Sequence, residues 1–187
     1  MGAKADASRT RILEAARTLF AEKGFARVSM ADVCNTAAIS RGGLYRYFSS
    51  TEELFGALVR QEQALAAAAL ERAQANAVPA KRVLETFLTA RLAQLLDPKR
   101  CYDKGELPDE CSEVRTLLIE RAESSVAIVA ALIRLGTEQG DYRCDTPEAA
   151  AAHILWLLEG MAKHNALLPL TQTDIDGQLC LIRRLLG

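Results

Sequence analysis

The segment 41–48 holds the side chains whose types and spacing could bind a polyanion: an arginine at its start, two adjacent glycines, and two tyrosines separated by one residue. As a helix, this segment has a small inner face made by Leu44 and Phe48. A glycine in a short helix costs about 1 kcal/mol relative to alanine, so Gly42 and Gly43 need a reason other than helix stability. Close approach of the backbone to the major groove of DNA, which is about 12 Å wide, supplies that reason.

The polar groups of this segment match the groups that DNA exposes. Arg41 can donate two hydrogen bonds to the O6 and N7 atoms of guanine. The hydroxyls of Tyr45, Tyr47 and Ser40, the last of which precedes the helix, can donate to phosphates on either side of the groove. The alternative is that the aromatic side chains pack beneath the helix that follows, and we expect this only of Phe48.

Other reactive residues are too dispersed to predict an enzyme. The two histidines, His153 and His164, belong to no Ser-His-Asp order, and the chain has no phosphate-binding loop and no paired metal ligands. We therefore expect no catalysis, no cofactor and no bound metal. The five cysteines include no C-x-x-C pair. Cys101 and Cys111 flank a polar segment, and Lys99, Arg100 and Lys104 lie nearby in the sequence. Cations lower the pKa of a thiol, so a thiol- or redox-responsive or metal-responsive repressor that senses through Cys101 and Cys111 is the alternative function.

Apolar residues recur at intervals of three and four along the chain, and no stretch alternates at two, which predicts an all-α protein. Helices are expected over residues 5–23, 29–36, 41–47, from 50 onward, 79–96, 112–139, 147–167 and 171–186. Ser29 followed by Asp32 has the pattern of a capping box. Ser50 followed by Glu53 is a stronger example, and Thr171 opens the last helix.

Half of the 187 residues are hydrophobic and 25% are charged, which suits a sizeable core and excludes a disordered chain. The longest apolar run, residues 126–133, is far shorter than the roughly 18 residues that span a bilayer, and no signal sequence begins the chain, so we expect a cytoplasmic protein. Residues 1–60 hold nine Lys and Arg against six Asp and Glu, whereas residues 61–187 hold 14 against 18. The basic N-terminal part is therefore the candidate to bind a polyanion.

Two short expected helices, separated by residues 37–39 within the basic part, form the pattern of a helix-turn-helix. Over residues 8–60 the chain resembles the DNA-binding domain of TetR/AcrR-type transcriptional regulators. The matching residues are Leu19-Phe20, Lys23-Gly24-Phe25, Ser29-Met30, 37–48 and Glu52-Glu53-Leu54. The resemblance implies about nine helices per subunit, with a three-helix DNA-binding domain at residues 1–50 and a ligand-binding and dimerisation domain at residues 51–187. It also implies a homodimeric repressor that a small-molecule effector releases from a palindromic operator in double-stranded DNA.

Carried over position by position, the resemblance places Ser29 and Met30 at the DNA backbone, residues 40–45 in the groove, and Tyr47 on a phosphate. Thr51 begins the helix that follows, where it can hydrogen-bond to a phosphate. The DNA-binding residues expected in this way are Ser29, Met30, Ser40, Arg41, Gly42, Gly43, Tyr45, Tyr47 and Thr51.

Two positions depart from the pattern of the family. Ala38 stands where glycine is common, so a residue that disfavours positive φ has to make the turn of the helix-turn-helix. Thr51 stands where lysine is common, and it keeps a hydrogen bond to phosphate but loses the charge. Weaker DNA affinity, or a weaker dependence of that affinity on salt, is the expected consequence.

The last two expected helices present apolar stripes that suit contact with a second subunit, since specific DNA sites are read by paired recognition helices about one DNA turn apart. The stripes consist of Ile154, Leu157, Leu158, Met161, Asn165, Ile175, Leu179, Ile182 and Leu186. A ligand pocket needs aliphatic walls and a few polar groups. The residues expected to line it are Phe87, Arg91, Leu118, Arg121, Ala122, Trp156 and Glu159. An ordinary core or surface position is the alternative for each of these residues, and the subunit's own core accounts for part of each stripe.

Overall fold

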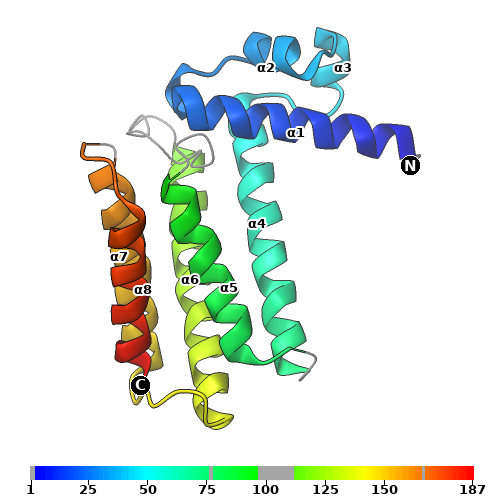
Figure 1. Cartoon of the computed structure of the whole chain (residues 1–187). Helices are drawn as coiled ribbons and strands as arrows, with labels where there is room; N and C mark the ends of the chain where they lie inside the picture. The colour runs from blue at the N-terminus through cyan, green and yellow to red at the C-terminus, as the bar shows by residue number, and fades with distance from the viewer. Residues whose placement is uncertain (1–2, 76–77, 97–111, 166) are drawn as a thin grey trace. The chain divides into compact units, whose positions relative to one another are not determined.

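The computed structural model describes residues 3–75, 78–96, 112–165 and 167–187 of the chain. Within these ranges it contains eight α-helices, one short 3-10 helix and no strand, which confirms the predicted all-α fold (Figure 1). None of the described helices combines the length and the apolar character that crossing a membrane requires.

The described residues form two compact units. Unit 1 consists of residues 3–62 and 112–119, and unit 2 consists of residues 63–75, 78–96, 120–165 and 167–187. The predicted division near residue 50, into a DNA-binding domain and a ligand-binding and dimerisation domain, is a division by function and stays a prediction.

Unit 1 contains the helix-turn-helix. Its elements are α1 (Ala3–Lys23), the 3-10 helix η1 (Phe25–Arg27), α2 (Met30–Ala37), α3 (Arg41–Tyr45), the first half of α4 (Thr51–Gln74) and the start of α6 (Ser112–Glu138). After α1, Gly24 adopts a φ of 76° and donates its N–H to the carbonyl of Phe20 at 3.0 Å. This is the role expected of a glycine just past a helix end. α3 ends at Tyr45 and not at the predicted Tyr47.

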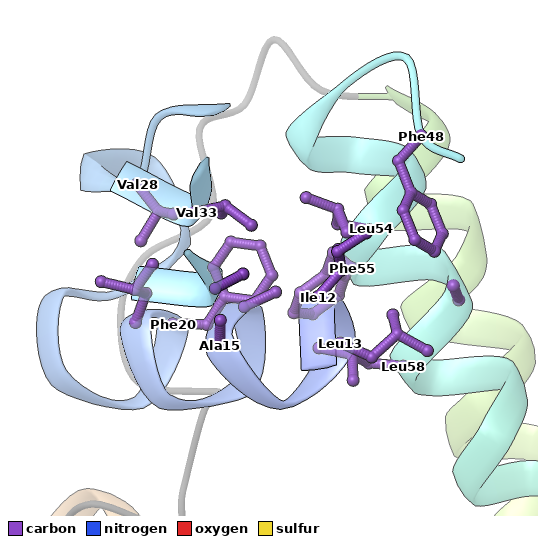
Figure 2. Packing of buried hydrophobic residues seen from close by; sticks show 14 of the residues in the cluster. Ile12, Leu13, Ala15, Phe20, Val28, Val33, Phe48, Leu54, Phe55 and Leu58 are labelled. Atoms are coloured by element: carbon purple, nitrogen blue, oxygen red, sulfur yellow. The ribbon is translucent and has the colours of Figure 1, made fainter. Parts of the chain in front are cut away.

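An apolar core joins α1, α2 and α4 in unit 1. The rings of Phe20, Phe25 and Phe55 pack together, with centroids 5.2 to 5.7 Å apart. Figure 2 shows Ile12 of α1 close to Leu54 and to Phe55 of α4. Aromatic pairs at this spacing contribute about 0.5–1.5 kcal/mol beyond the burial of their area. The core therefore fixes the position of α2, which the short α3 contacts.

Unit 2 is built from α5 (Ala80–Leu96), α7 (Pro147–Asn165) and α8 (Gln172–Leu186), with the remaining parts of α4 and α6. α5 contacts both α7 and α8, and these two helices contact each other. Leucine and isoleucine side chains spaced three or four residues apart fill the core between them. The buried residues of this kind are Leu84, Leu88, Leu92, Leu95, Ile154, Leu158, Ile175, Ile182 and Leu186.

The predicted stripes for contact with a second subunit are wrong in most of their residues. Buried in the core of unit 2, and so not available to another subunit, are Ile154, Leu158, Met161, Ile175, Ile182 and Leu186. The reason is that α7 and α8 each carry apolar side chains on more than one face. Trp156, Leu181 and Leu185 stand on the outward faces, with 68%, 55% and 44% of their surface exposed.

The capping box predicted at the start of α2 is present, and Thr171, the residue predicted to open the last helix, forms a capping box with Asp174 at the start of α8. The one predicted for α4 is shifted by a residue. The hydroxyl oxygen of Ser50 accepts a hydrogen bond from the N–H of Glu53 at 3.2 Å, as expected. The Glu53 carboxylate, however, accepts from the N–H and the hydroxyl of Ser49, at 2.6 and 2.8 Å, and these bonds hold the pKa of Glu53 below its ordinary value.

Candidate nucleic-acid interface

The start of α2 is fixed by a network around Asp32. Its carboxylate accepts hydrogen bonds from the N–H and the hydroxyl of Ser29, and the Lys23 ammonium lies 2.7 Å from it. The hydrogen bonds from Lys23 and Ser29 hold the pKa of Asp32 well below its usual range. The Ser29 hydroxyl is thus engaged in the cap of α2. Met30 follows it, with a half-buried side chain packed against the core of unit 1.

The turn between α2 and α3 is made by a left-handed alanine. Ala38 adopts φ 50° and ψ 51°, and it is the one non-glycine residue with positive φ in the described part of the chain. Its N–H bonds the carbonyl of Asn35 at 3.3 Å, and the N–H of Ile39 bonds that of Cys34 at 3.0 Å. An L-residue in this conformation costs roughly 1–2 kcal/mol. The departure from glycine at this position therefore leaves the turn geometry in place but strained.

α3 has one buried side and one open side. Leu44 is fully buried and Phe48, just beyond the helix, is 3% exposed, which confirms the predicted inner face. On the other side, Arg41 and Gly42 are exposed, and Tyr45 has 53% of its surface exposed. An open helix face that begins with arginine and contains glycine can approach a groove closely.

The two glycines of α3 differ in their surroundings. A Cβ atom on Gly42 would have no neighbour within 4 Å. A Cβ atom on Gly43 would meet the side chain of Ile39 and would lie 3.1 Å from the hydroxyl oxygen of Ser40. That hydroxyl also caps α3 by accepting the N–H of Gly43 at 3.2 Å. Gly43 therefore has a packing reason within the subunit, which the sequence interpretation missed, and the groove explanation applies to Gly42.

Tyr47 and Arg46 form a pair at the end of the helix-turn-helix. The ring of Tyr47 is half-buried against the core of unit 1, and its hydroxyl oxygen accepts a hydrogen bond from Arg46 at 3.0 Å. The guanidinium carbon of Arg46 also lies 5.0 Å from the centre of the ring. Because the hydroxyl oxygen accepts from Arg46, its proton points elsewhere and can be donated. Arg46 is exposed, and it was not among the DNA-binding residues expected from the sequence. Its position next to Tyr47 in the sequence could have indicated a second phosphate contact.

Thr51 is the first residue of α4 and is half-buried, and its hydroxyl donates to the carboxylate of Glu52 at 3.3 Å. It therefore lies at a helix start, as expected, with a local partner for its hydroxyl. Hydrogen bonds from the backbone of Glu52 itself and from neighbouring hydroxyls hold the pKa of that carboxyl below its ordinary value.

The residues expected to line a ligand pocket are spread over both units. Phe87 and Arg91 are half-buried on α5, and Arg91 donates to the Gln94 side chain at 3.4 Å. Leu118 packs against the core of unit 1, and Arg121 is half-buried in unit 2. The exposed members of the set are Ala122, Trp156 and Glu159. Trp156 lines a shallow hollow formed by α7 and α8, and the other six residues do not contribute to this hollow. The predicted ligand pocket therefore stays a prediction.

Cys101 and Cys111, on which the alternative kind of sensor depends, lie outside the described residues. Among the described cysteines, Cys34 is buried, Cys144 is half-buried and Cys180 is exposed, and all three are free thiols. The described residues include no cluster of three or more His, Cys, Asp or Glu side chains that could hold a metal ion.

Residues 12–58 match the family model described as bacterial regulatory proteins, tetR family. The chain is 48% identical over 63 residues to the HTH-type transcriptional regulator UidR of Escherichia coli, a match that covers 34% of this chain and 32% of UidR. The match therefore spans about a third of the length of this relative.

Two further similarities extend beyond the helix-turn-helix. The HTH-type transcriptional repressor AcnR of Corynebacterium glutamicum is 31% identical over 153 residues, which cover 78% of this chain and 74% of AcnR. The crystal structure of the reduced form of NemR from Escherichia coli has a TM-score of 0.78 over 96% of this chain and 98% of NemR, at 17% identity. The first similarity concerns sequence and the second concerns the fold alone.

Proposed function

Because the chain belongs to the TetR family of bacterial regulatory proteins, we propose that it is a ligand-responsive transcriptional repressor that binds a palindromic operator in double-stranded DNA. The observation that carries this proposal is the open face of α3, where Arg41, Gly42 and Tyr45 are exposed above a fully buried Leu44. A helix that is anchored by its buried side, and whose open side presents an arginine and a glycine, can enter a major groove. Its relatives are transcriptional regulators and not enzymes.

We assign the contacts by chemical type. Arg41, at the start of α3, donates to a guanine edge, and Gly42 lets the backbone approach the groove. Tyr45, Tyr47 and the added Arg46 reach phosphates, which fix the position of the protein without reading sequence. The remaining phosphate contacts are assigned to the starts of α2, α3 and α4, from Ser29, Met30, Ser40 and Thr51.

We propose that the chain forms a homodimer through the outward faces of α7 and α8. Trp156 and Leu181 are exposed there, and large apolar side chains gathered on a surface mark a contact with another protein. Gly160 and Gly177 lie on the same two helices, and a Cβ atom on either would have no neighbour within 4 Å. Small residues of this kind let two helices approach closely. Two subunits are also what a palindromic operator requires.

Release from the operator is proposed to follow from a small effector bound by the C-terminal part. The residues of unit 2 that we propose for such a pocket are Phe87, Arg91, Arg121, Ala122 and Glu159, while the exposure of Trp156 favours the dimer face for that residue. An effector shifts the population off DNA only by binding the two conformers with different affinity, and a coupling of about 1–3 kcal/mol is typical. Sensing by Cys101 and Cys111 stays the alternative. Because a repressor of this kind acts on bacterial operator DNA, we propose a cytoplasmic location.

The test is the selection of bound sequences from a random pool of double-stranded DNA by the purified chain. The expected product is a palindrome whose half-sites are separated by about one helical turn or a multiple of it. Recovery of sequences with no common motif, or of a motif without two-fold symmetry, would count against the proposal. The same DNA then serves for screening effectors, because an effector has to lower the fraction of bound operator.

A further inference from the structure

A cavity of about 170 Å³ lies in unit 2 between α5 and α8, and none of the residues expected to line a ligand pocket lines it. Its apolar walls are leucine and isoleucine side chains of both helices, among them Leu88 and Ile182. Its polar groups include Lys81, Arg183 and Tyr142, the last from the segment between α6 and α7. An apolar cavity with a few converging polar groups is the usual form of a small-molecule site.

The hydroxyl of Tyr142 is the first sign that this cavity takes a ligand. The side chain is 8% exposed, and within the described residues no hydrogen bond to its hydroxyl is found. The carboxylates of Glu85 and Asp141 raise the pKa of this phenol and the guanidinium of Arg183 lowers it, and Glu85 and Arg183 also line the cavity. A buried hydroxyl without a partner is costly, and a ligand atom that accepts its proton removes that cost.

The backbone of α6 at Gly136 fixes the position of the Tyr142 ring. A Cβ atom on Gly136 would lie 2.5 Å from the ring, so the ring rests directly on the backbone of α6. Burial raises the pKa of Tyr142, which keeps the phenol protonated and able to donate at neutral pH. The phenol is therefore a fixed donor at the edge of the cavity.

The charged side chains that line the cavity are two cations, Lys81 and Arg183, and one carboxylate, Glu85, and the carboxylate of Asp141 acts on Tyr142 as well. Arg183 and Glu85 form an ion pair with 3.5 Å between Nε and Oε1. Lys81 also lines the cavity and has no ion-pair partner in the described part of the chain, so it is the unmatched cation. A ligand with a single carboxylate suits these polar groups, because the carboxylate can accept a hydrogen bond from the phenol of Tyr142 and approach the ammonium of Lys81.

The volume sets the size of the apolar part. A cavity of about 150 Å³ with aliphatic walls is known to accept benzene, so the cavity between α5 and α8 has room for one ring. We propose that it binds a small aryl carboxylate of the size of benzoate, with the ring against Leu88 and Ile182 and the carboxylate at Tyr142 and Lys81. Leu181, which is exposed and belongs to the proposed dimer contact, does not line the cavity.

The experiment is a calorimetric titration of the whole chain, without DNA, with sodium benzoate and with benzyl alcohol as a neutral ring of similar size. Benzoate is expected to bind one site per chain with a Kd of about 1 mM or tighter, and benzyl alcohol at least about tenfold more weakly. Tyr142→Phe keeps the ring on Gly136 and removes the hydroxyl, and it is expected to weaken benzoate about tenfold. Lys81→Gln is expected to have an effect of similar size, and Lys163→Gln, a change on α7 outside the cavity, none.

The absence of saturable binding up to about 10 mM benzoate would overturn the proposal. So would equal binding of benzyl alcohol, or unchanged affinity in both Tyr142→Phe and Lys81→Gln. Thermal melting of each variant shows whether the fold is retained, and Tyr142→Phe is expected to melt no lower than the wild type because it removes a buried hydroxyl that has no hydrogen bond to the described residues. Since no DNA is present, failure here leaves the proposed repressor function untouched.

Discussion

Gly43 lies directly against Ile39: a Cβ atom on Gly43 would be only 2.8 Å from Cγ1 of Ile39. Carbon atoms do not approach so closely without a shift of one of them. Ile39 belongs to the turn that joins α2 to α3, so this contact sets how tightly the turn is packed onto α3. The neighbouring Gly42 has no such constraint.

The first prediction separates the two glycines. Gly43→Ala is expected to destabilise the chain by about 1–3 kcal/mol, because an extra methyl group in a filled site forces neighbouring atoms apart. Gly42→Ala is expected to raise or leave unchanged the stability, since alanine is the better helix former, and to weaken operator binding. Urea unfolding and gel shifts on the selected operator measure both properties. The reverse pattern, with Gly42→Ala unstable and Gly43→Ala merely poor at binding, would contradict the assignment.

Helical periodicity is sufficient to predict the inner face of α3, since Leu44 and Phe48 are four residues apart and both are buried. It cannot predict the role of Gly43, because the contact with Ile39 depends on the left-handed backbone at Ala38. In α7 the sequence shows apolar residues on more than one face. Which face the subunit covers depends on α5 and α8, so periodicity alone assigns Ile154 to the wrong surface.

The strained turn gives a second prediction. Ala38→Gly is expected to stabilise the chain by about 1 kcal/mol. Glycine adopts a φ of 50° without the steric cost that alanine has, and this gain outweighs the larger conformational entropy that glycine loses on folding. The midpoint of urea unfolding measures the change. Ala37→Gly, the same substitution at the last residue of α2, serves as the control and is expected to be destabilising. A loss of stability in Ala38→Gly would show that the left-handed turn is not a source of strain.

The third prediction concerns pH and the cap of α2. The pKa of Asp32 is lowered in the folded chain by its hydrogen bonds with Lys23 and Ser29. A carboxyl with a depressed folded pKa adds stability that is present above its unfolded pKa of about 3.9 and is lost as pH falls through the folded value. Asp32→Asn is therefore expected to be less stable than the wild type at pH 7, by a difference that shrinks below about pH 4. Thermal melts at several pH values measure it, and a difference that stays constant into acid would contradict the linkage.

The fourth prediction tests the proposed dimer face. Leu181→Glu is expected to convert the dimer to a monomer, because a charge would be buried in an apolar contact. Leu65→Glu is the matched control. Leu65 is 65% exposed and belongs to α4, not to α7 or α8, so its replacement is expected to leave the dimer intact. Sedimentation equilibrium gives the mass, and circular dichroism checks that the helices remain. Dimers of unchanged stability in Leu181→Glu would exclude this face.

The fifth prediction distinguishes reading of bases from contact with phosphates. Arg41→Ala is expected to lose about 1–3 kcal/mol of operator binding and to relax the preference for one base pair in each half-site. Arg46→Ala is expected to weaken operator and unrelated DNA alike, and to reduce the slope of log K against log salt by about one per subunit. Both side chains are exposed on unit 1, so neither change should alter the melting temperature much. Gel shifts on operator and scrambled DNA over a range of salt concentrations provide the measurement. Equal losses on both DNAs for Arg41→Ala would move that residue from the groove to the backbone, and with it the assignment of α3 as the helix that reads the sequence.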